Sequence, residues 1–275
     1  MMKNHVKESN GAIRDERNLP KSLSLTVFVL AFTAAAVITI LLGTGSLLAH
    51  SLWVEAPENP AKDEPVKVDI GFNDLFEPIA ISDSSVSKIS APTVIGVNGE
   101  ILTKLSGGAN YEYVTETPLS EGGYLAYVEY EPFLSARENE PNNRFFMTGK
   151  HIINIGASND ELITKPQGKT ALELVTLANP KTLKAGGSLP LQVYYDGKPL
   201  AGAEVYGDYR GFNPPGSWGL AKAFYCKADK EGKLDFIPAK GGLWMLKVRN
   251  YVPNEDTSEA AQTVHVHTLT FYVAE

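Results

Sequence analysis

The chain is poor in the residues that form covalent cross-links and metal clusters. Among its 275 residues there is one cysteine, Cys226. An intrachain disulfide, a zinc finger and an iron–sulfur centre are therefore excluded. Only four Met and five His are present, so soft metal ligands are few as well. Any transition-metal site in this protein must be small.

Basic side chains and enzyme motifs are also scarce. The chain has 25 Lys and Arg against 32 Asp and Glu, which gives a net charge of −7. An acidic protein without a basic patch does not suit nucleic acid as a partner. The sequence contains no Gly-x-Ser-x-Gly, no His-Glu-x-x-His and no glycine-rich phosphate loop. We therefore expect a binding protein, not an enzyme.

A long apolar run stands near the start of the chain. Residues 23–43 carry no charged side chain, and five Lys or Arg precede them. This length is enough to span a bilayer, and the basic flank places the N-terminal side in the cytoplasm. Two interpretations remain open: a signal peptide that is cleaved after Ala49, or an uncleaved anchor. Both place the chain from His50 onward in the periplasm.

The sequence thus predicts a cytoplasmic tail at 1–22 and a signal peptide or membrane anchor at 23–49. The protein would be periplasmic, and in the anchored form residues 23–48 would hold it to the inner membrane.

From His50 onward, short alternating apolar runs are separated by Gly, Pro, Asn and Asp clusters, which is typical of β-strands. Asn98-Gly99 and Asp196-Gly197 predict tight hairpins. A third turn, in "ADKEGKLDF", predicts that the strand at 233–237 pairs with the strand at 223–228. The polar segment 132–149 is expected to be a loop or short helix. The predicted strands are 50–55, 66–71, 92–97, 111–116, 123–131, 150–156, 171–177, 189–195, 203–209, 223–228, 233–237, 243–250 and 264–273.

This spacing of strands occurs twice, on either side of a polar stretch at 157–170. Six or seven short strands in about 110 residues are typical of a β-sandwich. The predicted fold is therefore all-β: two tandem immunoglobulin-like β-sandwich domains, at 50–160 and 165–275, that follow the N-terminal hydrophobic helix.

Four stretches together resemble a known bacterial family: "AHSLWVEA" at 49–56, "KPQGKTALELVTLANPKTLKAGGSLPLQVYYDGKPLAGAEV" at 165–205, "GLWMLKV" at 242–248 and "TLTFYV" at 268–273. The chain resembles the exported domain-of-unknown-function family labelled NikM-like, or nickel uptake substrate-specific region. The resemblance implies two immunoglobulin-like sandwiches and a link to nickel or cobalt uptake through membrane transporters. Many of these relatives carry a His-rich "GHHFP"-type motif after the second strand. This chain has "GFNDLFEP" at 71–78, with Phe72 where a His would stand.

His50 is the first candidate metal ligand. After cleavage at Ala49, its α-amine and Nδ1 would chelate one ion, and a second imidazole would complete a planar arrangement suited to Cu(II) or Ni(II). The alternative is that His50 is an ordinary strand-edge residue. Four carboxylates, Glu55, Asp74, Glu77 and Glu112, could add an oxygen ligand, but spacing singles none of them out, and the alternative for each is a solvated surface acid.

His265 and His267 form the second candidate. They are two residues apart on a predicted strand, so both side chains point to one face. Leu269, Phe271 and Val273 have the same parity, which supports the alternative of a core His pair satisfied by hydrogen bonds. His151 is interpreted as a core residue.

We therefore expect an exported metal-binding accessory protein linked to nickel or cobalt uptake, with His50, His265 and His267 as ligands. Nickel or cobalt is the expected ion, copper is a further candidate, and an inner-membrane metal transporter is the expected partner. The alternative is a membrane-anchored β-sandwich module that contacts protein or carbohydrate without metal, which the aromatic "GFNPPGSW" at 211–218 favours. A copper-dependent redox enzyme built on His50 is a third alternative.

Overall fold

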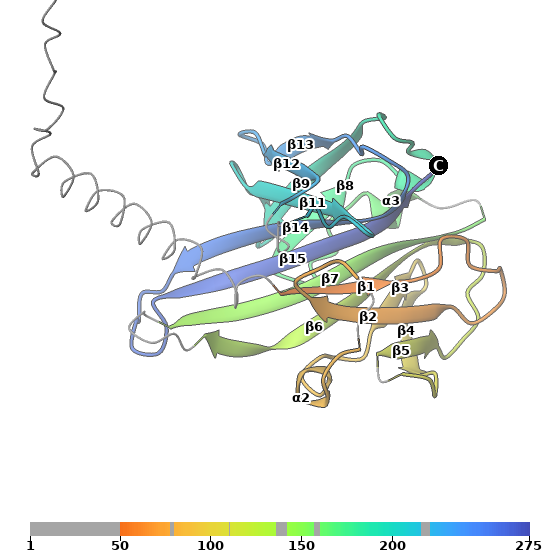
Figure 1. Ribbon diagram of the computed structural model, residues 1–275, viewed down its shortest axis with the longest axis horizontal. Helices are drawn as coiled ribbons and strands as arrows, with labels where there is room; N and C mark the ends of the chain where they lie inside the picture. Colours follow the sequence, from red (N-terminus) through yellow and green to blue (C-terminus); the bar gives the residue numbers. More distant parts are fainter. Residues whose placement is uncertain (1–49, 78–79, 110, 136–141, 157–159, 216–220) are drawn as a thin grey trace, which may run out of the picture. The chain divides into compact units, whose positions relative to one another are not determined.

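The computed structural model describes residues 50–275, apart from 78–79, 110, 136–141, 157–159 and 216–220 (Figure 1). Fifteen strands and three short helical segments make up this part of the chain. The expectation of an all-β fold is confirmed. The apolar run at 23–43 and Trp218 lie outside the described residues. Within them, no helix has the length and apolarity needed to cross a membrane.

The longest strands are β6 and β7 in the first half, with 14 and 13 residues, and β14 and β15 in the second, with 12 residues each. Their bounds are β1 (Ser51–Glu55), β2 (Lys67–Asn73), β3 (Thr93–Gly96), β4 (Gly99–Leu105), β5 (Glu112–Thr115), β6 (Gly122–Ser135), β7 (Asn143–Ile155), β8 (Leu172–Thr176), β9 (Leu189–Tyr195), β10 (Lys198–Pro199), β11 (Glu204–Tyr209), β12 (Phe224–Lys227), β13 (Lys233–Phe236), β14 (Gly242–Pro253) and β15 (Gln262–Val273). The helical segments are α2 (Asp83–Val86), α3 (Asp160–Ile163) and the 3-10 turn Pro180–Thr182.

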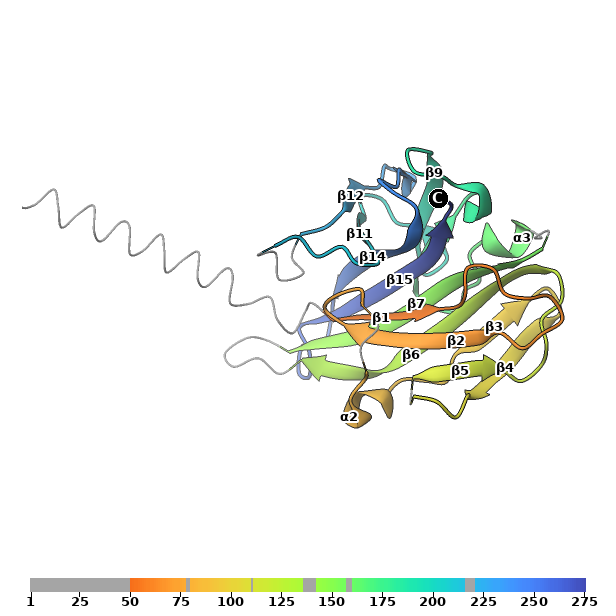
Figure 2. The ribbon, with the colours of Figure 1, turned by 45° about the vertical axis from the view of Figure 1, so that its right-hand side comes forward.

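Eleven strands form one curled sheet in the order β1-β2-β5-β4-β3-β6-β7-β15-β14-β11-β12 (Figures 1 and 2). The curl brings edge strand β1 back over the middle of the same sheet. There, the Thr268 hydroxyl donates to the Leu52 carbonyl at 2.6 Å. Gly149 allows this approach, because a Cβ on Gly149 would lie 3.0 Å from Trp53 Cα. β1 and β2 therefore form a layer on one face of the central strands β7 and β15.

A second sheet, built from β8, β9, β10 and β13, covers the opposite face of the central strands. Its apolar side chains, such as Leu174, Leu191 and Phe236, share one buried cluster with Leu269 and Phe271 of β15. Alternation along β15 therefore points His265 and His267 toward this second sheet, and Thr268 and Thr270 toward β1. The His265 and His267 side chains therefore lie on the face of the sheet opposite β1, the strand that His50 precedes.

The two expected domains are not confirmed as separate units. β7 from the first half pairs in parallel with β15 from the second, over nine residue pairs from Gln262↔Asn143 to Thr270↔His151. Residues 49–275 form one compact unit. The polar stretch at 157–170 lies in the chain between β7 of the eleven-stranded sheet and β8 of the second sheet. Alternation of apolar residues predicts strands, but it does not predict which strands pair across the middle of the chain.

All thirteen predicted strands are present, and the turn at Asp196-Gly197 joins paired residues Tyr195 and Lys198 as expected. Two predictions were wrong. The segment 132–149 was expected to be a loop or short helix, but β6 extends into it as far as Ser135 and β7 begins within it at Asn143. β13 pairs with β9 instead of β12, because β12 and β13 belong to different sheets.

Candidate metal centre

His50 lies directly before β1, and the register of β1 with β2 sets its surroundings. Ser51 pairs with Asn73 and Leu52 with Phe72, so the next step along the ladder places His50 opposite Asp74. The His50 and Phe72 rings stack with centroids 5.1 Å apart and planes 14° apart. The other neighbour of Phe72 is Tyr130, at 5.0 Å. The imidazole is therefore held by an aromatic stack on one side and faces a carboxylate.

His50 Nδ1 lies 3.5 Å from Asp74 Oδ1. Asp74 Oδ1 is buried and has no hydrogen-bond partner among the described residues. A separation of 3.5 Å is long for a hydrogen bond. It matches two ligands of one ion, since donors about 2.1 Å from a metal at a tetrahedral angle lie about 3.4 Å apart. The pair can therefore supply one nitrogen and one oxygen to a divalent ion.

Lys247 of β14 fixes the start of β1. Its ammonium donates to Ser51 Oγ at 2.8 Å and to the His50 carbonyl at 3.4 Å. Burial, together with the charges of Arg249 and Lys222, lowers the pKa of Lys247 well below its usual value. A lysine that gives up its proton more readily opposes a neighbouring cation less strongly. The backbone that would carry the His50 amine is thus anchored to the central sheet.

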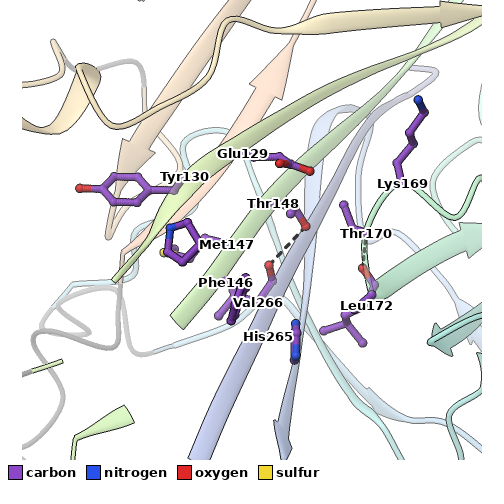
Figure 3. A pocket seen from close by; sticks show the side chains of 12 residues that line it. Glu129, Tyr130, Phe146, Met147, Thr148, Lys169, Thr170, Leu172, His265 and Val266 are labelled. Carbon is purple, nitrogen blue, oxygen red and sulfur yellow. Dashed lines mark hydrogen bonds between the residues drawn. The ribbon is translucent and has the colours of Figure 1, made fainter. Parts of the chain in front are cut away.

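His265 and His267 point toward the second sheet, as their parity predicts. His267 is fully buried, and its Nδ1 lies 2.8 Å from the Thr148 hydroxyl. His267 Nε2 has no hydrogen-bond partner within the described part of the chain. His265, which Figure 3 shows among the pocket residues, stacks on Phe146 at 5.2 Å. Its Nε2 lies 3.3 Å from the Tyr195 hydroxyl. Burial lowers the pKa of both imidazoles, so both are neutral at pH 7.

The structure does not bring His50 to this pair. Thr268, which follows His267 directly on β15, points to the opposite face of the sheet and donates to the Leu52 carbonyl of β1, the strand that His50 precedes. The central sheet therefore stands between His50 and His267. Across the described ranges, no group of three or more His, Cys, Asp and Glu side chains could hold a metal ion. At His50 a third donor would have to come from outside these side chains, and a terminal α-amine is such a donor.

The other candidates have structural roles in this geometry. His151 is fully buried, and its Nδ1 lies 2.9 Å from the Thr270 hydroxyl. This position agrees with its interpretation as a core residue. Glu55 forms an ion pair with Arg210. Glu112 pairs with Lys67 at 3.3 Å. Both carboxylates are thus paired with a basic side chain and not with His50.

A family model described as a domain of unknown function, DUF4198, matches residues 47–251 of the 275-residue chain. The chain belongs to the DUF4198 family. The match covers β1, β2 and most of β14, so it contains His50, Phe72, Asp74 and Lys247.

Other comparisons with this DUF4198 protein are weak. No curated protein matches it. Salmonella alpha-2-macroglobulin reacted with methylamine is 13% identical over 82% of this chain, with a TM-score of 0.21. The native conformation of E. coli alpha-2-macroglobulin is 10% identical over 82% of this chain, with a TM-score of 0.20. The DUF4198 chain spans 15% and 14% of these much longer proteins, and likeness at this level carries no conclusion about fold or function.

Asp74 is the residue of this candidate centre that spacing alone did not single out. A signal for it was present, because Asp74 has the same strand parity as Phe72 and so extends to the same face of β2. What the sequence lacked was the register of β1 against β2. Only that register shows that His50, and not Leu52, faces this carboxylate.

Proposed function

We propose that this protein is an exported metal-binding protein in which the mature chain begins at His50. The ion would be a divalent transition metal, nickel or cobalt, with copper as the third candidate. Its ligands would be the His50 α-amine, His50 Nδ1 and Asp74 Oδ1. The observation that carries this proposal is the 3.5 Å approach of His50 Nδ1 to a buried carboxylate oxygen without a hydrogen-bond partner in the described part of the chain.

The chemistry of the donors suits such an ion. An amine and an imidazole nitrogen of one residue close a chelate ring, which reduces the entropy lost when the second bond forms. Nitrogen ligands with one carboxylate favour the later first-row metals over magnesium or calcium. The α-amine would have to lose a proton to bind the ion, so binding would release protons.

His265 and His267 do not enter this proposal as ligands of the same ion. His267 Nδ1 already contacts Thr148, and both rings face the second sheet. Their expected role as ligands remains a separate prediction, which replacement of the pair by Ala would test. The resemblance to the NikM-like family supports a role in nickel or cobalt uptake, in which the protein delivers the ion to an inner-membrane transporter.

Native mass spectrometry tests the proposal directly. The full chain is expressed with export and purified without chelator. We expect a mass that begins at His50 and includes one nickel, cobalt or copper ion. Asp74→Asn should weaken binding by about tenfold, because a neutral amide oxygen is a poorer ligand than a carboxylate. Asp63→Asn, in the loop between β1 and β2, is the matched control.

Two results would overturn the proposal. One is a mature protein that binds none of these ions at any accessible concentration. The other is equal affinity of the wild-type protein, Asp74→Asn and His50→Gln, which would place the metal elsewhere. A mass that retains residues 1–49 would remove the α-amine from the ligand set.

A second candidate function is a contact surface without metal, and exposed tyrosines favour it. Tyr206 and Tyr225 lie with ring centroids 5.1 Å apart, and both hydroxyls donate to Glu204, at 2.8 and 3.1 Å. Tyr225 is 55% exposed and Tyr251 is 48% exposed. Aromatic rings held in place on a sheet suit contact with a sugar or a protein. Loss of binding on a glycan array by Tyr225→Ala, with metal binding retained, would support this function.

A further inference from the structure

A pocket of about 310 Å³ lies on the face of the central sheet opposite His50. Its floor is formed by β6, β7 and β15, which contribute Glu129, Phe146, Thr148 and His265. Its roof is the segment 169–172 at the start of β8. Figure 3 shows the floor side chains facing Thr170 and Leu172 across the pocket. The volume is at the lower end of the range for small-molecule sites, about 300–1,000 Å³.

Cross-strand register places the floor side chains in two rows. Glu129 pairs with Thr148, and Phe146 pairs with His265. The Phe146 and His265 rings are stacked, with planes 18° apart. Tyr195 holds the far edge of His265 through its hydroxyl at 3.3 Å. The floor therefore presents a fixed aromatic surface beside a carboxylate and a hydroxyl.

The roof is also fixed. Glu173, which is 2% exposed, accepts hydrogen bonds through Oε2 from the backbone N–H groups of Gln167 at 2.9 Å and Gly168 at 3.1 Å. Its Oε1 accepts from Tyr127 at 3.1 Å and from Lys150 at 3.3 Å. This buried network ties the turn before the roof to β6 and β7. The pocket is thus preorganised, which limits the entropy that a ligand must overcome.

The charges around the pocket do not cancel. Lys169 forms an ion pair with Glu100, and in Figure 3 its amine points away from the floor. Burial lowers the pKa of His265, so this ring adds no positive charge at pH 7. The Glu129 carboxylate, which lines the pocket, forms no ion pair with any side chain in the described ranges. The pocket therefore carries one uncompensated negative charge next to an aromatic face.

We propose that this pocket binds a small organic cation, an ammonium group attached to a flat apolar body. The ammonium group would pair with Glu129, the body would lie against Phe146 and His265, and the Thr148 hydroxyl would accept or donate one further hydrogen bond. Aromatic faces attract cations through their quadrupole, and a carboxylate fixes the position of the charge. None of the four side chains that would bind the cation belongs to the His50–Asp74 centre, so the proposal stands independently of the proposed metal function.

Isothermal titration calorimetry with tyramine tests the site, with 4-hydroxyphenylacetate as a probe of similar shape and opposite charge. The exported protein is used after metal removal with chelator. We expect tyramine to bind saturably at one site and the acid to show no binding. Glu129→Gln should weaken tyramine binding by up to about fivefold, because Glu129 is exposed and an exposed charge pair contributes up to about 1 kcal/mol. Glu116→Gln, an exposed carboxylate at the end of β5, is the matched control.

Three results would overturn the proposal: no saturable binding of tyramine, equal binding of the acid, or equal tyramine affinity in wild type and Glu129→Gln. Backbone NMR spectra of Glu129→Gln check that the variant is folded. Asp74→Asn should leave tyramine binding unchanged. Failure at this pocket is thereby distinguished from failure of the metal centre.

Discussion

The indole ring of Trp53 lies directly against the backbone of Gly71, its cross-strand neighbour in β2. A Cβ at position 71 would lie 1.9 Å from Trp53 Cε2. Trp53 is 1% exposed and also contacts Phe76 edge to face at 5.4 Å. The fit of this ring over a glycine fixes the register of β1 on β2, and that register places His50 opposite Asp74.

Gly71→Ala should therefore destabilise the protein by about 1–3 kcal/mol, the usual cost of overpacking a buried site. It should also weaken metal binding, because β1 must shift. Urea unfolding followed by Trp fluorescence measures the first effect and native mass spectrometry the second. In the double variant Gly71→Ala/Trp53→Phe the smaller ring leaves room for the methyl group. If the losses of stability caused by Gly71→Ala and by Trp53→Phe simply add in the double variant, the contact with Trp53 is not what destabilises Gly71→Ala.

Phe72→His should strengthen metal binding at His50 by at least about tenfold, because one additional nitrogen ligand is worth at least about 1.4 kcal/mol. The Phe72 ring lies beside His50, so an imidazole at this position, turned out of the parallel stack, would bring a nitrogen toward the same ion. Phe72→Leu removes the ring without adding a donor and serves as the control. Nickel titrations of the two variants should differ; equal affinities would mean that no ion lies between positions 50 and 72.

The sequence was sufficient to predict the core of most strands, because strands with one buried face alternate apolar and polar residues. It missed β4, whose side chains are largely exposed, and it missed the outer ends of β6 and β7. It also predicted that His265 and His267 share a face with Leu269 and Phe271, which the buried cluster confirms for the two apolar residues. Pairing was harder to predict. The parallel contact of β7 with β15 joins residues about 120 positions apart, and no local pattern encodes such a contact.

The proposed metal centre illustrates the same limit. His50 could be singled out from the predicted cleavage site and from its donors, both of which are local features. Asp74 could not, because its role depends on the register of two strands that the Trp53–Gly71 contact sets. The pocket at Glu129 was also beyond sequence reasoning, since its floor combines three strands from both halves of the chain.

The buried ion pair of Lys150 and Glu173 should show strong coupling. The two side chains are 2% and 3% exposed, with Nζ and Oε1 3.3 Å apart. Lys150→Met should cost about 3–5 kcal/mol, because it leaves a buried carboxylate without its cation. The double variant Lys150→Met/Glu173→Gln should recover part of this loss. Urea denaturation of the four proteins measures the coupling; a double variant less stable than the sum of both single losses would contradict this account.

His151 should make stability depend on pH below neutrality. Burial lowers its pKa from the usual value of 6.5 to about 3 in the folded state, with the Thr270 hydrogen bond as a smaller opposing effect. Between these two values the unfolded chain binds a proton that the folded chain does not. The contribution to stability is therefore fully present above pH 6.5 and is lost as the pH falls toward 3, by up to about 1.4 kcal/mol per pH unit.

Urea unfolding at half-unit steps from pH 7.0 to 5.0 measures this loss above the range in which most carboxylates titrate. His267, also fully buried with a lowered pKa, should act in the same direction. His151→Asn retains a donor for Thr270 but does not titrate. The variant should be less stable than wild type at pH 7 and should lose stability more slowly as the pH falls. Parallel curves for the two proteins would show that His151 takes up its proton in the folded state and contributes nothing to acid sensitivity.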